Sequence, residues 1–158
     1  MGPADTVNHG IQTKLKVALG RRYHFAAAHR LHSNRLSEAQ NRELYGKCNN
    51  PHGHGHNYIL EVRVSGPVDP ATGMIANLAD LDAFVQRQVL DNYDHKSFNE
   101  DVASFRDTDT VPTTENLCID IFQRLKTFPQ ATLEGIRVEE TSNNSFEYAG
   151  EHTEDAAQ

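Results

Sequence analysis

Histidine and glycine alternate over a short stretch of this chain, which places imidazoles at His52, His54 and His56. In an extended strand, residues two apart project to the same face, so these side chains should point the same way as Tyr58. His29 ends another alternating segment, on its apolar face. Three imidazoles that meet on a buried face are typical of a catalytic zinc site, because three protein ligands leave one tetrahedral position open. Spacing alone does not decide which two of the clustered histidines would join His29.

A cysteine lies just before this histidine cluster. Cys48 follows Lys47, and a neighbouring cation lowers the pKa of a thiol and populates the thiolate. Cys48 could therefore act as a nucleophile, a base or a metal ligand, and an inert buried thiol is the alternative. The second cysteine, Cys118, falls on the apolar stripe of a predicted helix, so we interpret it as core packing.

Two acidic positions could take part in proton transfer or ligand binding. Asp94 precedes His95, and a carboxylate beside an imidazole can orient it or favour its charged form, although the dipeptide alone is a weak signal. Glu140 continues the inward face of a predicted strand that also carries Ile136 and Val138. A carboxylate at the end of a buried stripe needs a partner, which is either a ligand's donors or a basic side chain.

Four strands are predicted to position these residues. Alternating apolar and polar residues indicate strands at 15–29, 54–64, 133–141 and 146–148. The first strand is long and could bend near its alanines. The candidate histidines lie at the end of the first strand and the start of the second.

Two helices are predicted between the second and third strands. Helical spacing of apolar residues indicates one helix that begins near Asn77 and another that follows Pro112, with Thr113 or Thr114 as its N-cap, and ends at Pro129. The order is then β-β-α-α-β-β. Two hairpins that flank two helices predict an α+β fold, in which a four-stranded antiparallel sheet carries both helices on one face.

The length and composition indicate one globular domain. The chain has 158 residues, and we expect a single domain at 15–150, a loose leader at 1–14 and a frayed acidic tail at 151–158. No apolar run approaches the ~18 residues of a membrane helix, so a membrane span is excluded. Two cysteines are too few for a secreted disulfide framework and no signal-peptide pattern opens the chain, so we expect a cytoplasmic protein.

The charge distribution favours a small anionic ligand. A net charge of -7 argues against a general nucleic-acid binder, because neutralising phosphates requires a basic surface. Yet the segment from Lys14 to Lys47 holds eight of the 15 basic residues and only two acids. Such a segment in an acidic protein suits a small anion better than a polyanion, and a solvated basic face is an equal alternative.

Several short motifs occur in a fixed order: Ala-Ala-His-Arg-Leu around His29, Gly-Lys-Cys-Asn-Asn-Pro at 46–51, Gly-His-Gly-His-Asn-Tyr at 53–58, Asp-Pro-Ala-Thr-Gly-Met at 69–74, Asn-Leu-Ala-Asp-Leu at 77–81, Asp-His-Lys at 94–96, Thr-Thr-Glu-Asn at 113–116, and Glu-Thr at 140–141 with Asn-Asn at 143–144. With these motifs, residues 15–150 resemble the 6-pyruvoyltetrahydropterin synthases. The resemblance implies the tunnelling fold (T-fold), in which subunits join their sheets into a barrel, here a homohexamer of two trimers.

The resemblance also implies a reaction. The family converts 7,8-dihydroneopterin triphosphate to 6-pyruvoyltetrahydropterin, a step of tetrahydrobiopterin biosynthesis that eliminates triphosphate and moves hydrogens within the substrate. By resemblance, zinc is held by His29, His54 and His56. Cys48 would abstract a proton, and Asp94 with His95 would complete a relay.

Pterin recognition is implied at the C-terminal half of the chain. By resemblance, Glu140 would accept hydrogen bonds from the guanidine-like edge of the pterin, and Thr113, Thr114 and Glu115 would lie near the pterin pocket. His52 departs from the family pattern, and we assign it to the surroundings of the metal or to the surface.

Two other functions fit parts of the sequence. The related 6-carboxytetrahydropterin synthases of queuosine biosynthesis usually have three residues between the cysteine and the first ligand, whereas Cys48 and His54 are separated by five. Cys48 and His52 are separated by three, so this alternative stays open. A non-catalytic zinc or pterin-binding module could lose Cys48, Asp94 or His95, but all three are present.

An oligomer is also expected from the sheet edges. Four strands leave free edges that can pair with another chain. In such an assembly, Arg21, Arg22 and Lys47 would face a shared pocket for the triphosphate. Glu140 would approach Cys48 or His95 of a neighbouring subunit.

Overall fold

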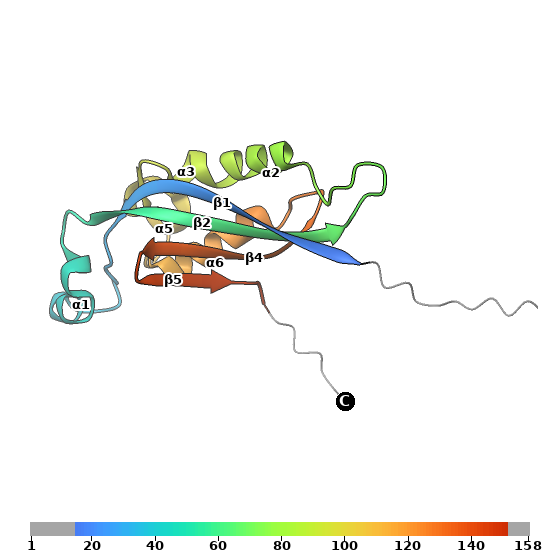
Figure 1. Ribbon diagram of the computed structural model, residues 1–158. Helices are drawn as coiled ribbons and strands as arrows, with labels where there is room; N and C mark the ends of the chain where they lie inside the picture. Colours follow the sequence, from blue (N-terminus) through green and yellow to red (C-terminus); the bar gives the residue numbers. More distant parts are fainter. Residues whose placement is uncertain (1–14, 152–158) are drawn as a thin grey trace, which may run out of the picture.

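The computed structural model describes residues 15–151, so the predicted leader at 1–14 and residues 152–158 of the predicted tail lie outside the described residues. One mixed sheet runs through this part of the chain (Figure 1), with the strand order β3-β1-β2-β4-β5. Its strands are β1 (Lys16–His29), β2 (His54–Pro67), β3 (Lys96–Ser97), β4 (Thr132–Thr141) and β5 (Asn144–Tyr148). The α+β prediction is confirmed, and the four predicted strands are β1, β2, β4 and β5.

The sheet differs from the prediction at one edge. β3 has two residues and pairs in parallel with Ala27 and Ala28 of β1, so the sheet is not wholly antiparallel. Two residues are too few to show an alternating pattern, and for this reason the sequence did not reveal the strand. The β1–β2 ladder is antiparallel from Lys16 opposite Pro67 to His29 opposite His54.

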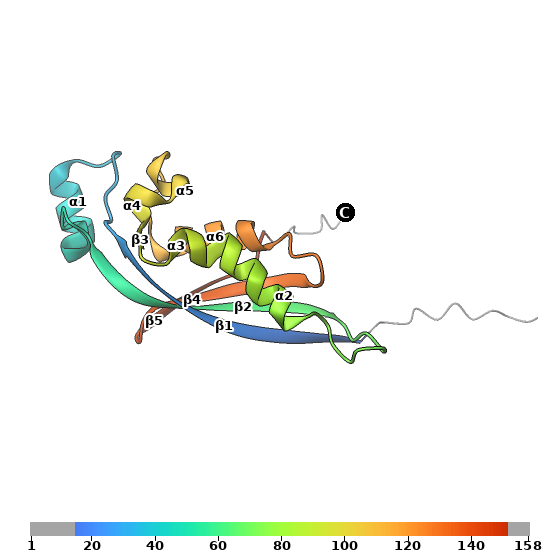
Figure 2. The same ribbon diagram turned by 90° about the horizontal axis from the view of Figure 1, so that it is seen from above.

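The first helix, α1, was not predicted because it has no apolar stripe. α1 (Glu38–Tyr45) buries only Asn41 among its residues, and the 3-10 turn η1 (Gly46–Asn49) follows it. A capping box starts α1: the Ser37 hydroxyl accepts from the Gln40 backbone at 3.2 Å, and the Gln40 side chain accepts from the Ser37 backbone at 2.9 Å. Figures 1 and 2 show α1 at the end of the sheet where β1 ends and β2 begins.

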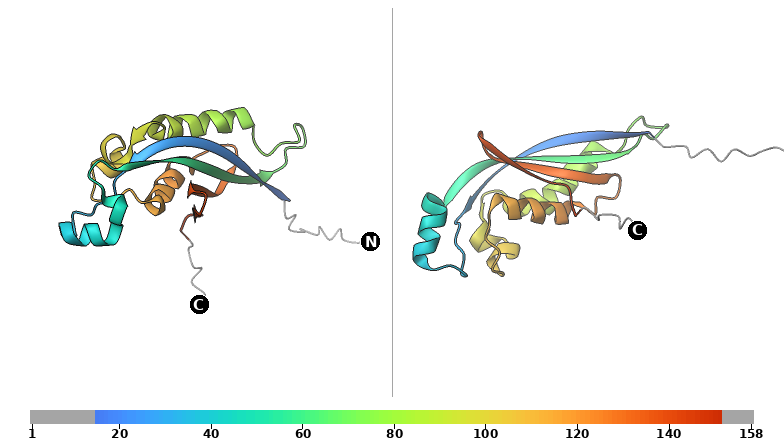
Figure 3. Two further views of the ribbon diagram at one scale, coloured as in Figure 1. Left: turned by 60° about the vertical axis from the view of Figure 1, so that its left-hand side comes forward. Right: turned by 90° about the horizontal axis from the view of Figure 1, so that it is seen from below.

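The predicted helices form the layer on one face of the sheet. The helical segments after β2 are α2 (Leu78–Val85), the π-helical turn η2 (Gln86–Leu90), α3 (Asp91–Tyr93), α4 (Phe98–Asp101), α5 (Ala103–Arg106) and α6 (Thr114–Leu125). Thr113 is the N-cap of α6, because its hydroxyl accepts from the Asn116 backbone at 3.3 Å. Figures 2 and 3 show α2, α3 and α6 on the same side of a twisted, bent sheet. None of the helices within residues 15–151 has the length and apolar character needed to cross a membrane.

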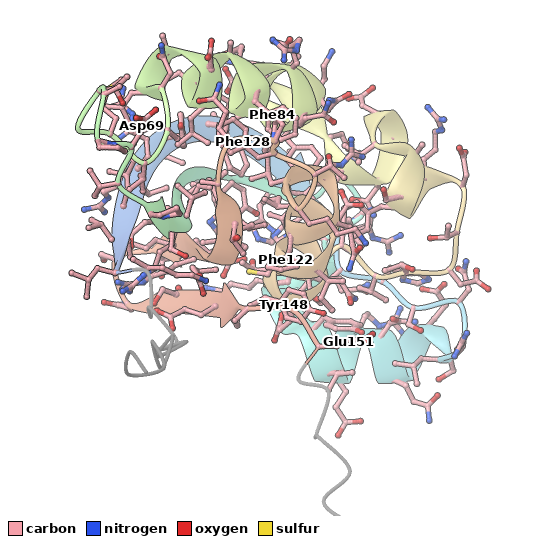
Figure 4. All side chains as sticks on the ribbon, turned by 90° about the vertical axis from the view of Figure 1, so that its right-hand side faces the viewer. Asp69, Phe84, Phe122, Phe128, Tyr148 and Glu151 are labelled. Atoms are coloured by element: carbon pink, nitrogen blue, oxygen red, sulfur yellow. The ribbon has the colours of Figure 1, made fainter. Side chains whose placement is uncertain are left out.

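The core lies between this helical layer and the sheet. β2 contributes the buried side chains of Tyr58, Leu60 and Val62, as alternation predicts. Two aromatic pairs, labelled in Figure 4, pack beside this core. The ring centroids of Phe84 and Phe128 are 5.4 Å apart, and those of Phe122 and Tyr148 are 5.1 Å apart. Cys118 is buried in this core, as expected, and burial raises the pKa of its thiol to about 12.

Candidate functional site

Three histidines converge where β1 ends and β2 begins. His29 lies opposite His54 in the antiparallel ladder, and His56 follows two residues later on the same face. The Nε2 atoms of His29 and His54 are 3.1 Å apart, and one ring nitrogen from each of the three lies within 4.8 Å of the others. The preceding turn needs glycine: Gly53 has φ +69°, and a Cβ there would lie 2.7 Å from the His29 carbonyl oxygen. The three histidines are therefore positioned to bind a metal ion.

The protonation of this cluster suits a metal. The Nδ1 atom of His29 lies 2.8 Å from the Pro112 carbonyl oxygen, which can only accept, so Nδ1 carries the proton and Nε2 keeps its lone pair. Burial lowers the pKa of both His29 and His56, which favours the neutral imidazole that binds metals. Three imidazoles facing one point fit a metal ion with three nitrogen ligands and an open position.

A carboxylate borders the histidine cluster. Glu140 Oε1 lies 3.8 Å from Nε2 of both His29 and His56. The same oxygen accepts from the Thr114 hydroxyl at 2.7 Å, and Oε2 accepts from the Asn144 amide at 2.9 Å. Burial alone would raise the pKa of Glu140, but the hydrogen bonds from Thr114 and Asn144 oppose this effect, and the pKa is lowered. Glu140 is therefore an anion at neutral pH, and within residues 15–151 it forms no ion pair with lysine or arginine.

The two threonines and Glu115 have different positions. Thr114 is buried and contacts Glu140, whereas Thr113 caps α6 and Glu115 is exposed. Asn144 is a site residue to which the sequence analysis assigned no role. Its place in the Asn-Asn pair just after Glu140 was the available signal, because asparagine at a tight hairpin often bonds to nearby groups.

Cys48 lies in η1 and is half-buried. The Leu31 backbone N–H donates to the Cys48 carbonyl at 2.8 Å, which ties this turn to the segment that follows His29. Burial is the main cause of a raised pKa at Tyr58, and the charge of Glu140 adds to it.

Asp94 and His95 occupy the sheet edge instead. Asp94 Oδ1 accepts from the Ala26 backbone at 2.9 Å and lies 3.0 Å from His95 Nδ1. The Ala26 hydrogen bond is the main reason that the pKa of Asp94 is lowered. The His95 side chain is 82% exposed, and the pair makes no hydrogen bond or ion pair with Cys48 or the histidine cluster within the described chain. The structure therefore does not join them to Cys48 in one chain.

These features can be compared with known proteins. The family model for 6-pyruvoyl tetrahydropterin synthase matches residues 18–151. The chain belongs to this family. A protein of Homo sapiens named 6-pyruvoyl tetrahydrobiopterin synthase is 45% identical over 139 residues, which cover 87% of this chain and 94% of that protein. A protein of the same name from Poecilia reticulata is 48% identical over 128 residues, covering 80% and 86% of the two chains.

A solved structure shows the same fold. The structure of Caenorhabditis elegans 6-pyruvoyl tetrahydropterin synthase superposes with a TM-score of 0.82 at 44% sequence identity. It covers 87% of this chain, and 97% of that chain is matched. The T-fold expected from the motifs of the synthase family is therefore confirmed for the subunit.

The third clustered histidine does not join the metal-binding group. His52 is exposed and lines a cavity of about 360 Å³ with Arg30 and Arg106. Gly53 turns the chain between His52 and His54, so the alternating strand begins only at His54. The choice of His54 and His56, which the synthase resemblance favoured and the spacing left open, agrees with this geometry.

The basic segment that was expected to bind an anion is only partly available for that role. Arg21 forms a two-pronged pair with Asp82, with N···O distances of 2.9 and 2.6 Å, and Arg22 lies 3.3 Å from Glu139. Both arginines therefore have acidic partners in their own chain, which weakens the expectation that they receive a triphosphate. Lys47, beside Cys48, is exposed.

Proposed function

We propose that this chain converts 7,8-dihydroneopterin triphosphate to 6-pyruvoyltetrahydropterin with elimination of triphosphate. The observation that carries the proposal is the meeting of three histidines and the Glu140 carboxylate in one partly buried site. Membership of the synthase family and relatives that bear this enzyme's name support the same reaction.

The proposed metal is zinc, held by the Nε2 atoms of His29, His54 and His56. Three nitrogen ligands with one open position are the pattern of catalytic zinc. When bound, zinc supplies a Lewis acid that polarises the hydroxylated side chain of the substrate and acidifies its carbon-bound hydrogens. The His29–Pro112 hydrogen bond keeps the His29 ring in the tautomer and orientation that this role requires.

Glu140 is proposed to anchor the pterin. A pterin presents adjacent N–H donors on its guanidine-like edge, and a carboxylate accepts such a pair in a charge-assisted contact. The lowered pKa keeps Glu140 ionised, and the hydrogen bonds from Thr114 and Asn144 fix the direction of its two oxygens. The site is thus prepared for a ligand with paired donors.

Cys48 is proposed to take the carbon-bound proton, and Asp94 with His95 to assist it. Because His95 is exposed at the β3 edge, we infer that the assisting pair comes from a neighbouring subunit. The strand pairing supports assembly. β3 pairs with β1 only at Ala27 and Ala28, so the rest of that edge of β1 is unpaired within the described chain. The outer edge of β5, at the other side of the sheet, is also unpaired there. Pairing of these edges between subunits would close a barrel, and we propose a cytoplasmic homohexamer of two trimers.

The 6-carboxy product is the second candidate. The five residues between Cys48 and His54 disfavour it, because the 6-carboxy enzymes usually have three residues between the cysteine and the first ligand. A spacing of three would require His52 as a ligand, and His52 lies outside the metal-binding group. A non-catalytic pterin-binding module is less well supported, because Cys48, Asp94 and His95 are all present.

The decisive experiment identifies the product. The zinc-loaded protein is incubated with 7,8-dihydroneopterin triphosphate, and the pterins and inorganic triphosphate are separated by chromatography and mass spectrometry. We expect 6-pyruvoyltetrahydropterin and triphosphate in equal amounts, and loss of both after zinc is removed with a chelator. Accumulation of the 6-carboxy product would assign the second candidate, and an unchanged substrate would contradict both.

A further inference from the structure

The side chain of Asn99, on α4, bonds to both backbone groups of Arg30, the residue that follows His29. Its Oδ1 atom accepts from the Arg30 N–H at 2.7 Å, and its Nδ2 atom donates to the Arg30 carbonyl at 2.9 Å. A backbone N–H can only donate and a carbonyl can only accept, so the orientation of this amide is determined. Asn99 therefore makes the two bonds that a residue of a neighbouring strand would make, just past the last residue of β1.

Residues 94–99 follow the edge of β1 from Ala26 to Arg30. Asp94 Oδ1 accepts from the Ala26 N–H at 2.9 Å, and β3 pairs with the next two residues of β1. Asn99 then holds Arg30, and Figure 2 shows α4 beside this end of β1. β3 is shorter than the usual ~3–10 residues of a strand, so the two side chains extend its pairing at both ends. Asn99 secures the end that carries the first histidine.

The peptide between Arg30 and Leu31 connects Asn99 to the turn η1, which holds Cys48. Its carbonyl accepts from Asn99 Nδ2, and its N–H donates to the Cys48 carbonyl at 2.8 Å. The peptide is trans, so these two groups point in opposite directions, and Asn99 and Cys48 are held on opposite sides of it. Hydrogen bonds in such a series polarise and strengthen one another. Loss of the Asn99 bond should therefore weaken the contact that holds η1.

The preceding peptide joins His29 to Arg30. Its N–H is the donor to Asn99 Oδ1, so the same side chain fixes the peptide plane next to the His29 side chain. The His29 ring is buried and its Nδ1 atom is bonded to the Pro112 carbonyl, so the backbone is what remains to be fixed. Removing a group that holds a metal ligand in place typically weakens metal binding by ~10- to 100-fold.

We propose that Asn99 is a positioning residue for the metal-binding end of β1, which fixes His29 through one peptide and the turn that holds Cys48 through the next. This inference rests on the proposed function, in which His29 binds zinc and Cys48 takes a proton. It assigns Asn99 no contact with the substrate.

Asn41, on α1, provides a matched control. Its Oδ1 atom accepts from the Ser33 N–H at 2.8 Å, and its Nδ2 atom donates to the Ser33 carbonyl at 2.9 Å, so it makes the same pair of bonds to one residue. Neither peptide beside Ser33 forms a backbone hydrogen bond with η1 within residues 15–151, and neither contains a candidate metal ligand. Asn41 is more buried than Asn99, so its loss should cost at least as much stability.

The first test compares Asn99→Leu with Asn41→Leu, because each removes both hydrogen bonds and keeps a side chain of similar size. The thermal midpoint, the zinc Kd in competition with a chelator, and the rate of Cys48 alkylation by iodoacetamide in the zinc-loaded protein are measured. Peptide mass spectrometry separates Cys48 from Cys118. Both variants should have a lower midpoint. Only Asn99→Leu should raise the zinc Kd, by about 10- to 100-fold, and alkylate faster at Cys48.

Asn99→Asp separates the two bonds and carries the test alone if Asn99→Leu does not fold. Its carboxylate can accept from the Arg30 N–H but cannot donate to the Arg30 carbonyl at neutral pH. The bond next to His29 is kept, and the bond in series with Cys48 is lost. We expect a zinc Kd close to that of the unaltered protein, together with faster alkylation of Cys48.

Turnover of dihydroneopterin triphosphate gives a further readout at saturating zinc. Asn99→Asp should lower kcat by ~10-fold, because a small displacement of a reacting group has an effect of this size. The KM should change by less than about threefold, since Glu140 forms its hydrogen bonds with Thr114 and Asn144 and none with this segment.

Two results would overturn the inference while leaving the proposed function intact. One is an equal loss of midpoint in Asn99→Leu and Asn41→Leu with no change in zinc Kd or alkylation, which would mean that Asn99 only holds α4 to β1. The other is an unchanged alkylation rate in Asn99→Asp, which would mean that no coupling reaches Cys48. If the unaltered protein bound zinc but left dihydroneopterin triphosphate unchanged, the proposed function would fail instead, and the zinc and alkylation measurements would still decide the positioning role.

Discussion

The amide nitrogen of Asn49 donates to the carbonyl oxygen of Leu31 at 2.7 Å. A carbonyl can only accept, so the orientation of this amide is determined, and the same nitrogen lies 3.0 Å from His32 Nδ1, which must therefore accept. The backbone bond from Leu31 to Cys48 lies alongside. Asn49 thus joins the Cys48 turn to the segment that follows the metal-binding end of β1.

We expect Asn49→Ala to lower turnover by ~10- to 100-fold, because small displacements of a reacting group have effects of this size. The rate of Cys48 alkylation by iodoacetamide should change as well, because the turn loses the hydrogen bond from the Asn49 side chain to Leu31. The bound zinc should stay near one per chain. The control is Asn50→Ala, which alters an exposed neighbour with only a bond to the His52 backbone. Equal effects from both variants would contradict a specific role for Asn49.

His54→Ala should abolish bound zinc, measured by atomic emission on the purified protein. Removing one of three converging nitrogens leaves a two-ligand site, which is too weak to retain the ion. The matched control is His52→Ala, which should keep full occupancy because His52 lies outside the cluster. Full zinc content in the His54 variant would show that the assignment of ligands is wrong.

Cys48→Ala should keep the fold and the zinc but lose ~100- to 10,000-fold in turnover, the usual contribution of a general base. Cys118→Ala should stay active, and its effect should appear as a lower thermal midpoint, because Cys118 is packed in the core. Comparable activity losses in the two variants would remove the distinction between a reactive and a packing cysteine.

Asp82→Asn should lower the thermal midpoint at pH 7 through loss of the pair with Arg21. The hydrogen bond from Arg21 lowers the pKa of Asp82 below its ordinary 3.8. A depressed carboxyl pKa contributes stability above the unfolded-state pKa and loses it as pH falls through the folded-state pKa. The midpoints of the two proteins should therefore converge at pH values below 3.8. The control is Glu43→Gln, at an exposed position of α1, whose midpoint should differ from that of the unaltered protein by the same amount at every pH. If the midpoint difference of Asp82→Asn were also the same at every pH, the charge of Asp82 could not be its cause.

Subunit mixing tests where each site residue comes from. We expect inactive Cys48→Ala and His95→Ala proteins to regain partial activity after subunit exchange, because His95 is exposed at the sheet edge and forms no hydrogen bond or ion pair with Cys48 within the described chain. Cys48→Ala mixed with Glu140→Ala should likewise regain partial activity if Glu140 meets Cys48 across an interface, as expected from the sequence, and should stay inactive if one chain supplies both residues. Full activity of a monomer in light scattering would refute a shared site.

The local pattern of the sequence was sufficient to predict the elements that carry the site. His54, His56 and Tyr58 share a face because side-chain direction in a strand alternates with every residue, whatever surrounds it. The same rule placed Glu140 on the inward face of β4. Four elements were not predicted: α1, β3, α4 and α5. A polar helix, a two-residue strand and four-residue helices do not show hydrophobic periodicity.

Only the tertiary structure decided which of these residues meet. The bond from His29 to Pro112 spans 83 positions, and that from Thr114 to Glu140 spans 26. Such pairs depend on how the helical layer docks on the sheet, and periodicity encodes which face of an element is buried but not what lies against it. The same docking leaves the Tyr58 hydroxyl without a hydrogen-bond partner among residues 15–151, while that of Tyr93 reaches Asp120. Two tyrosines that look alike in the sequence therefore differ in their chemistry.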